Sequence, residues 1–131
     1  MNILKLFQAH AAELLQDDDF LQNRNMYSCT QMSTNATMKA MESGKVYSSV
    51  SDEIESLQTE FRKLLREDAK SVLGFELPPR VLEDLESPYC TAFVHTACYD
   101  EHDEEYTGDE YTQRFVAARK AWLQFIIDKE A

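Results

Sequence analysis

Apolar residues recur every three or four positions between residues 51 and 73, which is the spacing of one face of an α-helix. These apolar positions are Ile54, Leu57, Phe61, Leu64, Leu65, Val72 and Leu73. The other face carries charges of both signs, at Glu60, Arg62, Lys63, Arg66, Glu67 and Lys70. Glu60 and Lys63, or Glu67 and Lys70, are three residues apart and can pair. Ser51 or Asp52 is suited to cap this amphipathic core helix, and Gly74 is suited to end it.

Both ends of the chain have the same helical spacing. Asn2 is a suitable cap for a helix over residues 2–16, whose apolar positions are Ile3, Leu6, Phe7, Ala11, Leu14 and Leu15. His10 lies near this face, and we expect it to be half-exposed or hydrogen-bonded. A final helix is predicted over 109–128, with an apolar face formed by Tyr111, Phe115, Ala118, Trp122, Phe125 and Ile126. Its basic residues, Arg114, Arg119 and Lys120, are expected on the other side, where they could fold back on acidic groups.

The middle of the chain is less regular. Residues 22–50 are rich in Asn, Ser, Thr and Met, and Ser33-Thr34 is suited to cap a short helix that ends before Gly44. Residues 46–50 include Val46, Tyr47 and Val50, whose β-propensity predicts a short extended segment. Pro78-Pro79 predicts a helix to about residue 86, and Ser87-Pro88 predicts another over 89–99. The sum is an all-α fold of five to six helices in a single domain, residues 1–131, with an acidic loop before the C-terminal helix.

The charge of the chain is concentrated in two places. The formal net charge is −11, and the segment 100–110 carries seven acids and no Lys or Arg. Asp17, Asp18 and Asp19 begin a predicted short helix that carries Phe20 and Leu21, and they add three more acids. The rest of the chain is nearly balanced, so the acidity is a local property of the surface. It argues against direct binding to nucleic acid or to an anionic membrane.

The segment from Tyr99 to Tyr111 is therefore the main candidate for function. One interpretation is a solvated loop, in which Asp109 and Glu110 favour the first turn of the next helix. The other is a binding surface, because Tyr99, Tyr106 and Tyr111 add contact area to carboxylates whose density approaches that of DNA phosphates. The candidate partner-binding residues are Asp100, Glu101, Asp103, Glu104, Glu105, Tyr106, Asp109 and Glu110, together with Asp17, Asp18 and Asp19 if the fold brings them alongside.

This interpretation predicts a small acidic inhibitor that occupies a basic, nucleic-acid-binding surface of a partner protein, as DNA-mimicking anti-restriction or anti-defence proteins of mobile elements do. A different class is a chaperone or immunity-like protein with one cognate partner, using an apolar surface near the methionines of residues 26–41. Under the first hypothesis, the acids dominate binding. Under the second, neutralising them changes little.

A metal-dependent enzyme is the third hypothesis. Cys98 and His102 are four residues apart, so they would share a face if the helix continued, but zinc needs three or four ligands. A calcium loop that begins at Asp103 fails because Arg114 falls where a bidentate Glu is needed. No nucleotide-binding or hydrolase motif is present. We therefore predict no catalytic residues, no metal site and no cofactor.

Compartment is predicted from cysteine usage and the N-terminal sequence. The three cysteines are an odd number without a Cys-x-x-Cys pair, which favours reduced thiols. The start of the chain becomes polar too soon for a signal peptide, and no apolar run approaches the length of a membrane span. The sequence therefore predicts a cytoplasmic protein.

Overall fold

The computed structural model describes residues 2–23, 35–86, 96–102 and 104–130. Within these ranges the chain forms six helices, which confirms the all-α prediction. They are α1 (Ile3–Leu15), α2 (Asp18–Gln22), a helix over 35–42, α4 (Tyr47–Leu73), α5 (Pro79–Glu86) and α7 (Gly108–Asp128). Extended pairing among the described residues is limited to one isolated antiparallel bridge between Tyr99 and Glu105.

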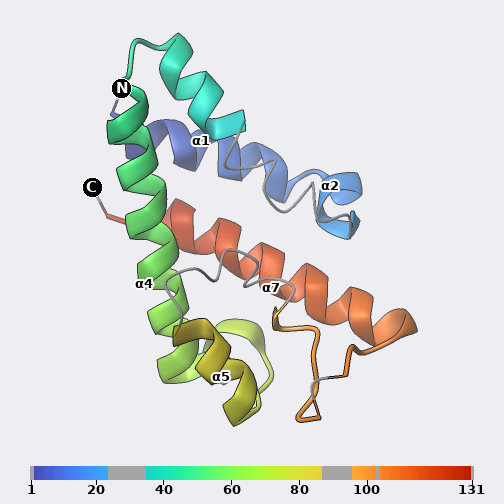
Figure 1. Ribbon diagram of the computed structural model, residues 1–131. Helices are drawn as coiled ribbons and strands as arrows, with labels where there is room; N and C mark the ends of the chain where they lie inside the picture. The colour runs from blue at the N-terminus through green and yellow to red at the C-terminus, as the bar shows by residue number, and fades with distance from the viewer. Residues whose placement is uncertain (1, 24–34, 87–95, 103, 131) are drawn as a thin grey trace.

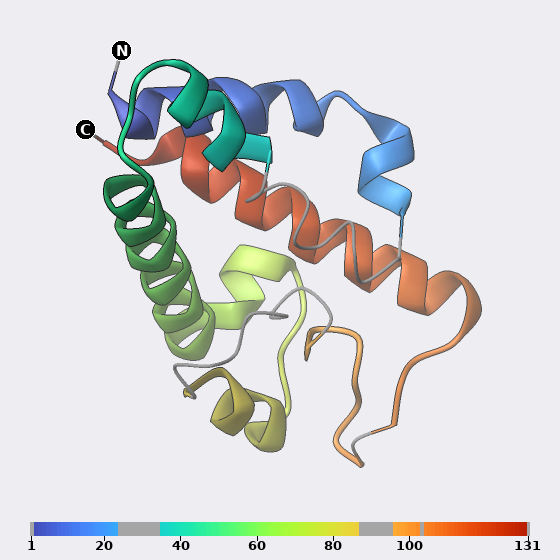
Figure 2. The same cartoon turned by 45° about the horizontal axis from the view of Figure 1, so that its top comes forward.

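Helix α7 is the centre of the arrangement. In Figure 1 it runs antiparallel to α1, while α4 crosses one end of the pair and α5 lies at the far end of α4. The turned view in Figure 2 also places helix 35–42 beside α1 and brings the two chain termini to the same end of the molecule. Gln8 fastens α1 to that end of α7, because its Nε2 lies 3.1, 3.1 and 2.7 Å from the carbonyl oxygens of Ile126, Ile127 and Lys129. Carbonyls left unpaired at the end of a helix are thereby satisfied.

The first two helices begin as their cap residues predict. Asn2 Oδ1 accepts a hydrogen bond from the Lys5 backbone N–H (2.8 Å), and Asp17 Oδ1 accepts one from the Phe20 N–H (3.1 Å). The prediction that His10 is half-exposed or hydrogen-bonded is met in part: its side chain is buried, its Nδ1 lies 3.4 Å from Lys39 Nζ, and its Nε2 has no partner among the described residues. The buried face of α1 is therefore broader than the apolar pattern indicated.

The start of α4 differs from the prediction. Residues 46–50 were expected to be extended, and Ser51 or Asp52 was expected to cap the helix. Instead Val46 is the N-cap, without a side-chain hydrogen bond, and the helix begins at Tyr47. Val50 is fully buried and lies one turn before Ile54, so burial of its side chain outweighs the β-propensity of the segment. As predicted, Gly74 ends the helix in the left-handed conformation, with φ of 89°.

Two arginines predicted on exposed helix faces are buried. Arg119 is 2% exposed and Arg62 is 6% exposed. The Arg119 guanidinium donates hydrogen bonds to the carbonyl oxygens of Phe20 (2.5 Å) and Asn23 (2.9 Å). Its central carbon also lies 4.5 Å from the ring centre of Phe20 and 4.4 Å from that of Phe115. Arg119 thus joins the end of α2 to α7, rather than folding back on the acids.

A long-range ion pair replaces the predicted contact between Glu60 and Lys63. Glu60 Oε2 lies 2.5 Å from Nζ of Lys129, just beyond the end of α7. Arg66 makes another connection between elements, because its Nη1 donates to the Leu85 carbonyl of α5 (3.1 Å). Polar residues of α4 therefore contact the end of α7 from the middle of the helix and α5 from its second half.

The structure tests the predictions for the other short helices only in part. The helix before Gly44 is confirmed over 35–42, whereas its predicted cap at 33–34 lies outside the described residues. Helix α5 is confirmed. Most of the helix predicted over 89–99 also lies outside the described residues, but its last part was wrong, because the chain turns at 97–98 and Tyr99 enters the bridge.

Candidate functional site: an acidic hairpin beside α7

Residues 98–102 and 104–106 double back on themselves and form what we call the acidic hairpin. The Asp100 N–H donates to the Glu104 carbonyl (2.8 Å), and the Tyr106 N–H donates to the Cys98 carbonyl (2.9 Å). Cys98 itself is fully buried, and its Sγ lies 3.9 Å from the Tyr111 carbonyl oxygen of α7. The base of the hairpin is therefore fixed to the core, while its turn carries acids.

Asp100 shapes this turn. Its Oδ1 accepts hydrogen bonds from the backbone N–H groups of His102 (2.8 Å) and Glu104 (3.0 Å). These two donors, Glu104 first, lower the pKa of the Asp100 carboxyl because they stabilise its charged form. Asp100 was predicted as a partner-binding residue, but one of its oxygens is committed to the hairpin.

Arg114 holds the other side of the acidic hairpin against the helices. Its guanidinium carbon lies 4.0 Å from the ring centre of Tyr106 and 4.3 Å from that of Phe75. Its Nε also donates to Glu110 Oε1 (3.4 Å). Of the three basic residues expected to approach the acids, Arg114 contacts an acid of its own helix, Glu110. Its guanidinium also covers part of the Tyr106 ring.

Most of the predicted acids remain on the surface. The exposed members are Glu101, Glu104, Glu105, Asp109 and Glu110, whereas Asp103 lies outside the described residues. Tyr99 and Tyr106 are half-buried, but Tyr111 is only 6% exposed and stacks on Phe115. The expectation that Tyr111 would contribute surface contact area was therefore wrong. Its place in the apolar spacing of α7 was the better indication.

The second acidic group lies on another part of the surface. Asp17 caps α2, and Asp18 and Asp19 are exposed on its first turn. Figures 1 and 2 place α2 on one side of α7 and the acidic hairpin on the other. Arg119, which holds α2, is ten residues after Asp109, or about 15 Å along the helix. The structure thus presents two separated acidic areas.

The residues proposed for a zinc site do not come together. Cys98 is fully buried, whereas the His102 side chain is 75% exposed, because the chain turns instead of continuing as a helix. Among the described residues, no three His, Cys, Asp or Glu side chains form a group that could hold a metal ion.

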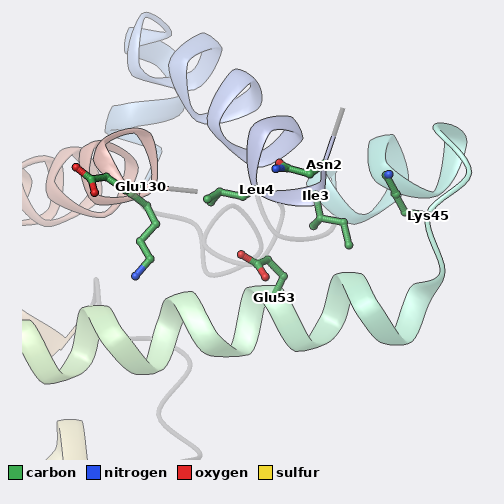
Figure 3. Close-up of a pocket in the computed structure, with 7 residues that line it drawn as sticks. Asn2, Ile3, Leu4, Lys45, Glu53 and Glu130 are labelled. Carbon is green, nitrogen blue, oxygen red and sulfur yellow. The ribbon is translucent and has the colours of Figure 1, made fainter.

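An open groove of about 460 Å³ lies at the opposite end of the molecule, near both termini. It is lined by Asn2, Ile3, Leu4, Lys45, Glu53, Lys129 and Glu130. Figure 3 shows Glu53 extending from α4 toward the start of α1. The lining combines opposite charges with an apolar wall, but it includes no Ser, Cys or His that could act as a nucleophile or base.

A third surface feature is apolar. Four large side chains are exposed at the turn between helix 35–42 and α4: Met38 (56%), Met41 (48%), Val46 (65%) and Tyr47 (61%). Ala36 and Ala40 form the buried side of the same short helix. The apolar Met-rich surface of the chaperone-like hypothesis is therefore present in part, while Met26 and Met32 lie outside the described residues.

In comparisons with known proteins, no family model, curated protein or solved structure matches this chain. The helices of the described part of the chain include none that is long and apolar enough to cross a membrane.

Proposed function

We propose that this protein binds a basic, nucleic-acid-binding surface of a partner protein and inhibits it by occupying that surface, as a DNA-mimicking anti-defence protein would. The observation that carries the proposal is the acidic hairpin. Backbone hydrogen bonds and the Asp100 turn hold the backbone that carries these acids, so less conformational entropy is lost on binding than for a floppy acidic tail.

The charge pattern fits such a partner. Glu101, Glu104 and Glu105 are exposed within five residues, and no Lys or Arg lies between them. Duplex DNA presents one charge per about 1.7 Å of its axis, and proteins that bind it match that density with Lys and Arg. Carboxylates held on a surface would attract the same Lys and Arg side chains. Such attraction raises the association rate and weakens as salt is added.

The test compares two baits of equal charge. The triple variant Glu101→Gln, Glu104→Gln and Glu105→Gln removes three of the five carboxylates between residues 98 and 106, and its matched control, D52N/E55Q/E67Q, removes three exposed carboxylates of α4. Each variant changes the formal net charge from −11 to −8, because three carboxylates are neutralised.

Both baits and the native chain are immobilised and exposed to a cell lysate at low salt, and retained proteins are eluted with a salt gradient. The proposal predicts that the native chain and the α4 control retain the same nucleic-acid-binding protein, whereas the hairpin variant loses it. Equal retention by the two triple variants would contradict it, because the position of the acids would then not matter.

The exposed apolar residues favour a second candidate, a chaperone or immunity-like protein with one cognate partner. An apolar interface resists salt and depends on side-chain burial rather than on charge. Met38→Gln with Met41→Gln preserves helix propensity and removes apolar surface. If this pair of substitutions abolishes retention while the neutralised hairpin leaves it intact, the apolar surface is the binding site.

A further inference from the structure

His10 of α1 is a buried polar residue that plays no part in the acidic hairpin. Its side chain is 7% exposed, and its Nε2 has no hydrogen-bond partner among the described residues. The ring borders a small enclosed cavity of about 10 Å³, whose other lining residues are Phe7, Ala36, Ile54, Leu57, Trp122 and Ile126. All of these are apolar or, for Trp122, predominantly so. A water would find too few polar partners there to be well held.

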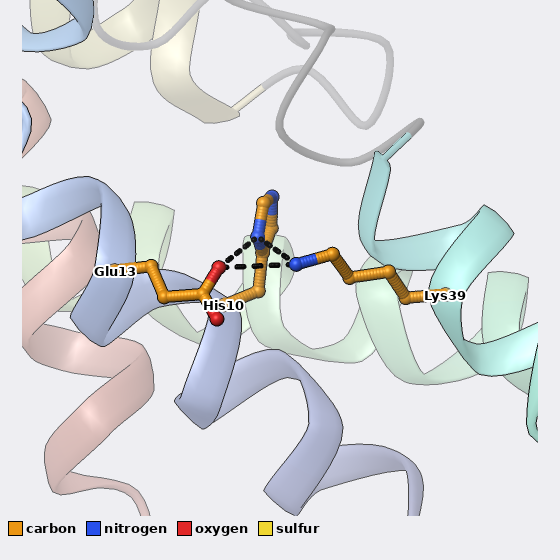
Figure 4. A network of polar contacts seen from close by, with 3 residues as sticks. All are labelled: His10, Glu13 and Lys39. Atoms are coloured by element: carbon orange, nitrogen blue, oxygen red, sulfur yellow. Dashed lines mark hydrogen bonds and ion pairs between the residues drawn. The ribbon is translucent and has the colours of Figure 1, made fainter.

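The other ring nitrogen of His10 faces a charged pair. Figure 4 shows Lys39 and Glu13 converging on Nδ1. The Lys39 Nζ lies 3.4 Å from His10 Nδ1 and 3.0 Å from Glu13 Oε2, and that same oxygen lies 3.6 Å from His10 Nδ1. An ammonium group only donates, so the contact with Lys39 is a hydrogen bond in the tautomer whose Nδ1 accepts and whose proton lies on Nε2, whereas an Nδ1–H would instead donate to Glu13.

Protonation of His10 conflicts with this arrangement. The second proton has to go on Nδ1, which then loses the Lys39 hydrogen bond and places a positive ring beside an ammonium group. Among the residues that the structure describes, Glu13 is the acid in contact with the pair, and its Oε2 would have to serve both cations. The residues that α4 and α7 contribute to the cavity carry no compensating charge.

The group that responds to this conflict is helix 35–42, because it carries Lys39. The buried face of this helix consists of Ala36 (4% exposed) and Ala40 (0%), both small, whereas Met38 and Met41 point to solvent. Little apolar area therefore holds the helix in place, and the contact of Lys39 with α1 forms a larger share of its attachment.

We propose that His10 is a pH-sensitive latch, whose protonation releases helix 35–42 from α1. Release would uncover the apolar cavity wall beneath Ala36 and enlarge the exposed apolar surface that already includes Met38 and Met41. The latch is independent of the acidic hairpin.

The direction of the response follows from the environment of the ring. Burial, and next the charge of Lys39, lower the pKa of His10 from its ordinary value of 6.5, while Glu13 opposes this. Because His10 is harder to protonate when helix 35–42 is packed against it than when the helix is released, a fall in pH favours the released state. The attachment is thus at full strength above pH 6.5 and weakens below it, until the lowered pKa of the packed state is reached. Since one proton is taken up, the change is at most about tenfold per pH unit.

Amide hydrogen exchange measured by NMR tests the latch in the full chain. Protection factors, which correct for the intrinsic pH dependence of exchange, are compared between pH 7.5 and 5.5 for helix 35–42 and for α7. We expect protection of helix 35–42 to fall up to about tenfold between pH 6.5 and 5.5, with the interior of α7 nearly unchanged. Equal protection of helix 35–42 at both pH values would overturn the proposal.

Two substitutions assign the response to His10. The variants His10→Gln and His10→Phe both lack a titrating ring, while the other two histidines of the chain are kept. Either variant is expected to have pH-independent protection over 35–42. The same loss of protection at low pH in a folded His10 variant would show that another group is responsible.

A carboxylate variant tests the geometry of the cluster without changing His10. The substitution Glu13→Gln removes the acid that favours the protonated ring, so the pKa of His10 in the packed state falls further. The loss of protection should still begin near pH 6.5, but it should continue to lower pH and become larger in total. Its matched control is Glu42→Gln, an exposed acid on helix 35–42 itself. Identical pH profiles for these two variants would contradict a sensor built from His10, Lys39 and Glu13.

Discussion

Replacing Arg119 tests how the packing of α2 on α7 is achieved. Arg119 is almost fully buried and donates to the carbonyl oxygens of Phe20 and Asn23 at 2.5 and 2.9 Å. A hydrogen bond from a charged donor contributes about 1.5–3 kcal/mol. The substitution Arg119→Met keeps much of the side-chain volume between the rings of Phe20 and Phe115 but removes both bonds.

We expect Arg119→Met to lower the free energy of unfolding by about 3 kcal/mol, and Arg119→Ala by about 4–5 kcal/mol because packing is lost as well. For a chain of this length, about 4 °C of melting temperature is lost per kcal/mol, so the two variants should melt about 12 and 16–20 °C lower. A domain is stable by only about 5–15 kcal/mol, so the loss is large.

Urea unfolding provides the assay. The fluorescence of Trp122, the single tryptophan of the chain, reports the core, and far-UV circular dichroism reports the helices. The control is Lys120→Ala, which removes an exposed positive charge from the next position of α7. If Arg119→Met unfolded at the same urea concentration as the control, the guanidinium contacts would not hold α2, and our explanation of its burial would be wrong.

Three further predictions concern local structure. Val46→Ser should raise the melting temperature, because an N-cap hydroxyl contributes about 0.5–2 kcal/mol and Val46 makes no cap bond while 65% exposed; an unchanged or lower temperature would contradict this. Asp68→Ala should destabilise α4 by about 1 kcal/mol in urea unfolding, since Asp68 has non-helical φ/ψ and its Oδ1 accepts from the Ser71 N–H (3.3 Å); no loss would show that the kink needs no cap. Asp100→Ala should speed amide exchange in the acidic hairpin, while Asp100→Asn, which keeps an acceptor oxygen, should not; equal exchange in both variants would refute this role. In the native chain, exchange should also rise below pH 3.8, as the lowered pKa of the Asp100 carboxyl is approached.

The helices could be predicted because their signals are local. Asn2 and Asp17 cap helices through their own side chains, and Gly74 ends α4 with a conformation that glycine readily adopts. The apolar spacing of α7 likewise identified Phe115 and Trp122 as core residues. Each of these signals acts within a few residues of the feature that it determines.

The failures have a common physical cause, which is contact with distant parts of the chain. Arg119 is buried because α2 supplies carbonyl oxygens almost a hundred residues away, and His10 is buried beneath a helix that carries Lys39. Val50 is helical because it completes the buried stripe of α4, against the β-propensity of residues 46–50. Side-chain polarity and local propensity contain no information about such partners.

The acidic hairpin combines features that the sequence indicates locally with features that depend on distant contacts. Its charge was evident in the sequence, and an Asp two residues before a backbone donor is a known turn former, so the role of Asp100 could have been suspected. The pairing of Tyr99 with Glu105 and the stacking of Arg114 on Tyr106 depend on how α7 follows the turn. The sequence thus indicated which residues carry the charge, but not how they are held.

Competition with DNA is the most direct test of the proposed inhibitor. A protein retained from lysate on the immobilised chain is eluted either with a short DNA duplex or with polyglutamate at the same ionic strength. The proposal predicts that the duplex releases the protein at concentrations where polyglutamate does not, because the acidic hairpin and DNA occupy one basic surface. If the retained protein instead binds the duplex while remaining on the immobilised chain, the two sites are separate and the central claim is wrong.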